Sequence, residues 1–135
     1  MKSKKFFLIE KEPIVEKNGS LIVVETLKDI PIPVKRIFYE FGVSFASKRG
    51  EHANKKSRFC MICLTGSCVV DVDDGENKKS YCLNDSRKIL FIDRMVWKTM
   101  HSFSSDCVLF VLSDNYYDKN EYIKDYNEFL KEVRS

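Results

Sequence analysis

The sequence predicts an all-β protein, an antiparallel sandwich or barrel with one C-terminal helix. Short β-branched or aromatic runs recur at roughly ten-residue spacing, as in sandwiches and barrels. Turn signals rich in Gly, Pro or Asp separate these runs. Near the C-terminus the spacing of apolar residues changes to that of a helix. The 135 residues suffice for one domain, residues 1–135, with one core.

The first expected strand covers residues 20–25, which are mostly β-branched and follow a turn signal at Gly19. Two prolines then break the chain before a second strand over residues 34–41. Strand alternation places Arg36 and Tyr39 on opposite faces of this second strand.

A tight hairpin is expected at Gly66, because two apolar runs flank it directly. A second turn signal, Asp74-Gly75, follows. The strands expected around and after these turns cover residues 59–64, 68–72, 79–83, 88–92, 95–100 and 107–112.

The last segment predicts an amphipathic helix on the outside of the β-structure. Asp118 and Glu121 have the spacing of a capping box. Tyr126, Phe129 and Val133 then recur at helical spacing. This pattern is typical of a packing helix rather than a binding helix.

Composition excludes several classes of protein. The net charge is +3, from 23 basic and 20 acidic residues, which is too balanced for a nucleic-acid-binding protein. No apolar run approaches the roughly 20 residues of a membrane span, and the run after the basic N-terminus is too short for a signal peptide. We therefore expect a cytoplasmic protein.

The five cysteines indicate free thiols rather than a disulfide framework, because most lie inside apolar runs. Cys60 and Cys63 have a Cys-x-x-Cys spacing, but residues three apart on a strand point to opposite faces. We expect both to be buried as hydrophobic residues, without a metal or redox role.

The segment 48–55 is the strongest candidate for a functional site. It places a glycine, a histidine and clustered cations between two strands, which is typical of the rim of a site. His52 is one of only two histidines. Aromatic surfaces suit a base or sugar ring, and arginines suit a diphosphate. Residues that could line a pocket with His52 are Arg36, Tyr39, Arg49, Trp97 and Lys98.

The spacing from His52 to Gly66 has the outline of the first cupin motif. That motif carries a His-x-His pair, then a carboxylate, then a glycine at the hairpin. Here Asn54 stands at the second histidine and Phe59 at the carboxylate. A divalent transition metal needs three or four imidazole or carboxylate ligands. The spacing therefore supports a cupin (jelly-roll) barrel and argues against a metal.

Motifs along nearly the whole chain, from about Lys17 to about Val133, together indicate a family. They include Gly19-Ser20-Leu21-Ile22, Lys35-Arg36-Ile37-Phe38-Tyr39, Arg49-Gly50 with His52-Ala53, Met95-Val96-Trp97 and Tyr116-Tyr117-Asp118. The chain resembles the sugar 3,4-ketoisomerases of the cupin superfamily, which act on dTDP-4-keto-6-deoxyglucose.

The resemblance implies a homodimeric jelly-roll barrel, often with exchanged N-terminal strands. It implies a dTDP-linked sugar inside the barrel, no metal and no cofactor. The implied reaction moves the carbonyl of the hexose from C4 to C3, in deoxysugar or O-antigen precursor biosynthesis. A histidine pair, helped by a tyrosine, shuttles the proton in the family.

Residue by residue, His52 matches the first histidine of the shuttle and Tyr39 the tyrosine. Arg36 and Arg49 match the family arginines. Departures from the pattern occur at Asn18, which remains a candidate for substrate binding, at Asn54 and at Phe59. Asparagine can hydrogen-bond a hydroxyl but cannot take a proton near neutral pH.

Three hypotheses follow. The main one is a dTDP-4-keto-6-deoxyhexose ketoisomerase with His52 as the acid/base and Asn54 as a positioning group. The second is a catalytically silent cupin that binds a nucleotide sugar or an active paralogue. The third is an epimerase or isomerase of another sugar, in which His52 acts alone or Lys98 supplies a second proton carrier.

Overall fold

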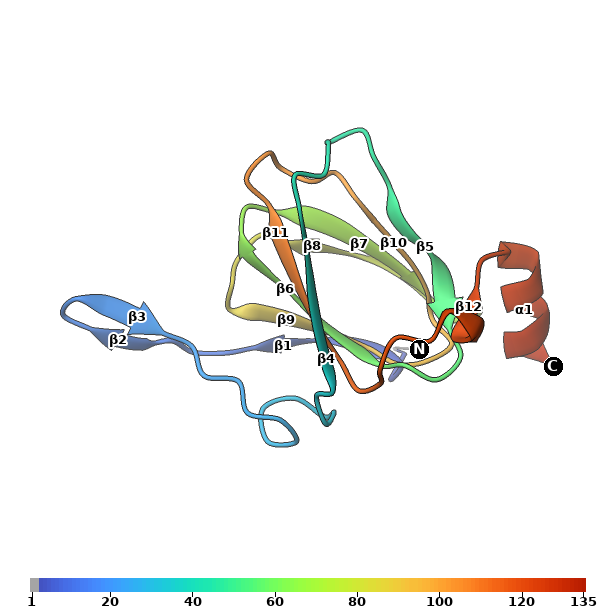
Figure 1. Cartoon of the computed structure of the whole chain (residues 1–135), viewed down its shortest axis with the longest axis horizontal. Coiled ribbons are helices and arrows are strands. Elements are labelled where there is room, and N and C mark those ends of the chain that lie inside the picture. The colour runs from blue at the N-terminus through green and yellow to red at the C-terminus, as the bar shows by residue number, and fades with distance from the viewer. Residues whose placement is uncertain (1–2) are drawn as a thin grey trace.

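Two five-stranded antiparallel sheets form the body of the protein. The computed structural model describes residues 3–135. The sheet orders are β1-β9-β6-β11-β4 and β12-β5-β10-β7-β8 (Figure 1). The first sheet comprises β1 (Phe6–Glu10), β9 (Lys88–Ile92), β6 (Phe59–Thr65), β11 (Val108–Ser113) and β4 (Arg36–Phe41). The second comprises β12 (Tyr122–Ile123), β5 (Arg49–Asn54), β10 (Trp97–His101), β7 (Cys68–Asp73) and β8 (Lys78–Leu83). This arrangement confirms the expected all-β fold.

The main core fills the space between the two sheets, because each strand turns one set of alternate side chains inward. Met61 of β6, Val70 of β7 and Leu109 of β11 are almost completely buried there. A second apolar cluster lies on the other face of the first sheet. In that cluster, Ile30 and Ile32 cover side chains of β6, β9 and β11.

A small hairpin, β2 (Ile14–Glu16) with β3 (Gly19–Leu21), extends away from the body on the side opposite the C-terminal helix (Figure 1). The expectation of a strand over residues 20–25 is therefore only partly correct. The strand ends at Leu21 because its partner, β2, offers only three paired residues.

The expected hairpin at Gly66 is confirmed. Its φ of +68° lies in the left-handed region that glycine adopts without strain. A Cβ there would lie 2.7 Å from Cys107 Cα, so the turn also needs the missing side chain. The turn brings β6 and β7 into opposite sheets.

The C-terminal helix, α1 (Tyr126–Arg134), begins later than the sequence predicts. Asp125, not Asp118, caps it, by accepting a 3.0 Å hydrogen bond from the Glu128 backbone N–H. Asp118 instead caps the 3₁₀ turn η1 (Lys119–Glu121). β12 follows and pairs with β5, which holds the chain extended until residue 123.

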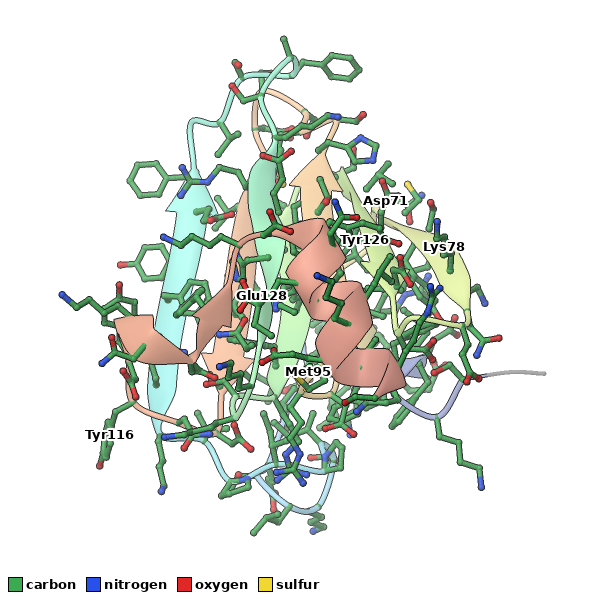
Figure 2. The ribbon with its side chains drawn as sticks, turned by 90° about the vertical axis from the view of Figure 1, so that its right-hand side faces the viewer. Asp71, Lys78, Met95, Tyr116, Tyr126 and Glu128 are labelled. Carbon is green, nitrogen blue, oxygen red and sulfur yellow. The ribbon has the colours of Figure 1, made fainter. Side chains whose placement is uncertain are left out.

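The helix lies on the outside of the second sheet, as expected. Phe129 is fully buried against Ala53 and Ile123. Figure 2 looks onto this helix, with Tyr126 beside the strands that carry Asp71 and Lys78 and with Met95 beside the lower turns of the helix. In residues 3–135, none of the helical segments combines the length and apolar character needed to cross a bilayer.

Candidate functional site

The segment expected as the rim of a site is strand β5. A bulge interrupts its pairing with β10, and Gly50 and Glu51 both have positive φ there. Across the bulge, Arg49 pairs with Met100 and His52 pairs with Lys98. Cross-strand partners share a face. The extra residue therefore turns both Arg49 and His52 toward the interior, although they are three positions apart.

His52 is half-buried beside the Tyr122 ring, with the ring centroids 4.7 Å apart. Burial, followed by the positive charge of Lys98, lowers the pKa of His52 to about 4. The imidazole is therefore neutral at neutral pH, and one of its ring nitrogens is free to accept a proton.

Asn54 and Lys98 form a buried polar pair beside His52. Lys98 Nζ donates a 2.7 Å hydrogen bond to Asn54 Oδ1, and the two residues are 2% and 1% exposed respectively. The ammonium also lies 4.6 Å from the centre of the Phe59 ring. Burial is the main cause that lowers the pKa of Lys98 to about 7.

Arg36 projects inward from β4 among three aromatic rings. Its guanidinium carbon lies 5.4 Å from the Phe38 ring centre, 6.0 Å from that of Phe59 and 5.8 Å from that of Tyr117. Its Nη2 donates a 3.4 Å hydrogen bond to Ser113 Oγ. Packing on ring faces fixes the plane of the guanidinium.

Arg49 links the two sheets at their facing edges. Its Nη2 lies 3.1 Å from Glu40 Oε1, and its Nε donates a 3.1 Å hydrogen bond to the same oxygen. Glu40 belongs to β4, the edge strand of the first sheet. We call Arg36, Glu40, Arg49, His52, Asn54 and Lys98 the inner polar group.

Unpaired buried atoms gather in the inner polar group. Among residues 3–135, the buried side-chain nitrogen and oxygen atoms that lack a hydrogen-bond partner are Arg36 Nε, Glu40 Oε2 and Asn54 Nδ2. Each such atom lowers the free energy of unfolding by about 1–3 kcal/mol if no partner binds it. Two unpaired donors and one unpaired acceptor on strands β4 and β5 are polar groups that a polar ligand could satisfy.

Three residues predicted for the site lie elsewhere in the single chain. Tyr39 is on the outer face of β4, 60% exposed, because strand alternation turns it away from Arg36. Trp97 is on the outer face of β10 and packs on Tyr126 and Phe129 of the helix. Asn18 lies in the turn of the extended β2–β3 hairpin (Figure 1). Within one chain, these three side chains therefore do not join the inner polar group.

The sequence reading missed several neighbours of the site. Tyr117 and Tyr122 lie at its edge, where their ring centroids are 5.9 Å apart. Glu121 is buried and binds the backbone N–H groups of Lys56 and Ser57 at 2.9 and 2.8 Å. The sequence pattern placed Glu121 and Tyr122 at the start of a helix and showed Tyr117 only as part of a family motif, so it gave no signal for their positions beside the site.

A second cluster of chemically active side chains lies away from this site. Cys63 Sγ is 3.6 Å from both Cys68 Sγ and Cys107 Sγ, and all three thiols are buried. Among residues 3–135, these are the Cys, His and acidic side chains grouped closely enough to hold a metal ion. They lie near the Gly66 turn, whereas Lys98 contacts Phe59 at the other end of β6. As expected, Cys60 and Cys63 point to opposite faces of β6.

The two sheets and their inner polar group define a jelly-roll protein with a candidate site inside the sandwich, built from charged and amide side chains. Residues 4–134 match the family described as FdtA: WxcM-like, C-terminal. The chain belongs to this family, that of the sugar 3,4-ketoisomerases.

Relatives agree with this assignment. The TDP-4-oxo-6-deoxy-alpha-D-glucose-3,4-oxoisomerase of Aneurinibacillus thermoaerophilus is 40% identical over 126 residues, which cover 93% of this chain and 91% of the relative. The structure of the TDP-fucose-3,4-ketoisomerase WlaRA from Campylobacter jejuni is 42% identical, covers 95% of each chain and has a TM-score of 0.90. A mutant 3,4-ketoisomerase from Thermoanaerobacterium thermosaccharolyticum, in complex with TDP-4-keto-6-deoxyglucose, is 34% identical. It covers 98% of this chain and 96% of its own, with a TM-score of 0.93.

Proposed function

We propose that this protein converts a TDP-linked 4-keto-6-deoxyhexose into the 3-keto sugar. The presence of three unpaired buried polar atoms in the inner polar group carries the proposal. Arg36 Nε and Asn54 Nδ2 are donors, and sugar or phosphate oxygens are their natural acceptors. Glu40 Oε2 is an acceptor for a sugar hydroxyl. The identity of the relatives supports TDP-4-keto-6-deoxyglucose as the first substrate to test.

His52 is the residue that moves the proton between the two carbons. The reaction needs a base at C3, an enediol and a proton returned at C4. His52 is buried, held neutral by its surroundings and turned inward by the β5 bulge. Because Asn54 cannot exchange a proton near neutral pH, it acts as a donor to a sugar oxygen rather than as a second base.

The assay follows deuterium from D₂O into C3 and C4 of TDP-4-keto-6-deoxyglucose by NMR. We expect the wild-type protein to form the 3-keto sugar and to exchange these positions. No exchange in the wild-type protein, and none after Asn54→His, would contradict a ketoisomerase. Calorimetry with TDP then distinguishes a catalytically silent binding protein from an active ketoisomerase, because the silent protein would bind TDP without turnover. The identity of the relatives favours turnover.

We also propose that the protein is a homodimer formed through the outer face of the first sheet. Ile37, Tyr39, Phe41 and Leu64 are 51–69% exposed on that face. Apolar and aromatic area of this extent marks an interaction surface. The β2–β3 hairpin extends from the same region, where Ser20, Ile37 and Leu64 line one groove. Contact of the hairpin with a second copy would give Asn18 and Tyr39 a role between subunits.

Light scattering tests the assembly directly. We expect a dimer in the wild-type protein and a monomer in Ile37→Glu, because a charge at the interface would be desolvated without a partner. A wild-type monomer would contradict this part of the proposal and leave the reaction unaffected. The free thiols favour a reducing compartment, which supports a cytoplasmic location.

A further inference from the structure

Lys98 is a buried lysine with no carboxylate partner. The ion pairs within residues 3–135 do not include it. Its contacts are the Asn54 amide oxygen and the face of the Phe59 ring. Burying an unpaired ammonium is costly, and proteins neutralise such a group unless it serves a purpose. The position therefore calls for a functional explanation.

The charged groups that face Lys98 come from three directions. Arg36 on β4 and His52 on β5 do not stabilise an ammonium, while Glu121 on η1 does. The Glu121 carboxylate is already bound by the Ser57 hydroxyl and by two backbone N–H groups, so it attracts Lys98 only at longer range. The balance holds the pKa of Lys98 near 7, where amine and ammonium are both populated.

Burial also lowers the pKa of the neighbouring imidazole. The pKa of His52 is lowered to about 4, so at neutral pH the proton of this pair resides on Lys98. Two adjacent groups with different pKa values can divide the roles of acid and base. His52 is then the base and Lys98 the acid at the start of the reaction.

The Asn54 amide is oriented by Lys98. An ammonium can only donate, so the amide presents its oxygen to Nζ and turns its Nδ2 the other way. That Nδ2 is buried and unpaired. A fixed donor beside a proton-bearing amine suits an oxygen that gains negative charge during enolisation.

We propose that Lys98 carries the oxygen-bound protons of the isomerisation while His52 carries the carbon-bound proton. This role rests on the proposed function. It assigns to Lys98 the transfer of protons to and from the sugar oxygens, which the Asn54 amide cannot perform near neutral pH. His52 takes the proton from C3, the C–H electron pair forms the C3–C4 double bond, and O4 takes a proton from the Lys98 ammonium. The resulting amine takes the proton from O3 as the C3 carbonyl forms, and the imidazolium returns its proton to C4. Both groups end as they began.

The variants Lys98→Arg and Lys98→Met test whether Lys98 transfers protons or only supplies a charge and packing contacts. Arginine keeps the charge and the donors but does not release a proton, whereas methionine keeps only the apolar stem. We expect both variants to lose about 10²–10⁴ in kcat, with the Kd for TDP changed less than about threefold. The matched control, Lys79→Met, changes an exposed lysine of strand β8 and should keep wild-type kcat.

The pH profile gives a second measurement. In the wild-type protein, kcat/KM should fall as pH rises through about 7, because the Lys98 ammonium is lost. This alkaline limb should disappear from the residual activity of Lys98→Arg. A purely electrostatic role would instead be rescued by arginine.

The outcomes distinguish this inference from the function on which it rests. An inactive wild-type protein contradicts the ketoisomerase reaction and with it the role of Lys98. An active wild-type protein with a Lys98→Arg variant within tenfold of it overturns only the role of Lys98. Loss of TDP binding in both variants would assign Lys98 a structural role and would also overturn the inference.

Discussion

The two ends of strand β6 differ in how completely their buried groups are satisfied. Near the Gly66 turn, Cys63 is surrounded by thiols and apolar side chains, and the space is closed. Near Phe59, buried cations and an amide face inward, with donors left unpaired. The end near Gly66 therefore stabilises the fold, whereas the end near Phe59 lowers the free energy of unfolding. Such a cost is what a binding site in a small core is expected to carry.

The largest expected effect is at His52. His52→Asn removes the base, so kcat should fall by about 10²–10⁴ in an assay with TDP-4-keto-6-deoxyglucose. His101→Asn is the matched control, because His101 lies outside the site and binds Asp71 and Ser102 at 2.8 Å. Equal losses in the two variants would mean that His52 has no special role.

At the closed end, Leu109→Ala should lower the free energy of unfolding by about 2–5 kcal/mol, because Leu109 is fully buried and truncation leaves a cavity. Urea denaturation followed by circular dichroism measures this change. Ser105→Ala, at an exposed position near the same turn, should stay within about 0.5 kcal/mol. A small effect at Leu109 would remove the contrast between the two ends.

At the polar end, an apolar replacement should have the opposite sign. Lys98→Met should raise the free energy of unfolding at pH 6 by about 1–4 kcal/mol, because it removes a buried ammonium. Since the pKa of Lys98 is lowered to about 7, the unfolded chain binds more protons above that pH. Wild-type stability should therefore gain a contribution as pH rises from about 7 to 10, and the variant should lack it. Destabilisation at pH 6 would contradict this assignment.

The smallest expected effect concerns thiol reactivity. Cys82 is exposed and the other four cysteines are buried. A thiol reagent should label Cys82 quickly in the native protein and the others only on unfolding, because labelling needs an accessible thiolate. In Cys82→Ser the fast phase should vanish. Fast labelling of Cys107 would show that the Gly66 end opens in the native state.

Local patterns predicted most of the strands, because period-two alternation and turn residues act within a few positions. Residues 88–92 form a strand with the expected bounds, and the turn at Gly66 is where glycine indicated it. The helix start was placed too early, because Tyr122 and Ile123 pair with β5 rather than continue a helix. That pairing depends on a partner about 70 residues away in sequence.

The site was only partly predictable. The sequence predicted five of the six members of the inner polar group, all except Glu40, because the chemistry of each residue type is visible in the sequence. It could not exclude Trp97, whose inward or outward direction depends on the strand register. It also gave no reason for Arg49 and His52 to share a face, because the β5 bulge is visible only in the pairing with β10.

The sequence by itself determined the all-β class, the family and the presence of one candidate imidazole, because these depend on residue identity and short-range spacing. The tertiary structure alone decided which side chains meet. It paired Lys98 with Asn54, turned Tyr39 away and left three polar atoms unpaired inside the sandwich. The reason is that register, bulges and burial are set by contacts between strands distant in sequence, and those contacts fix the direction and pKa of each side chain.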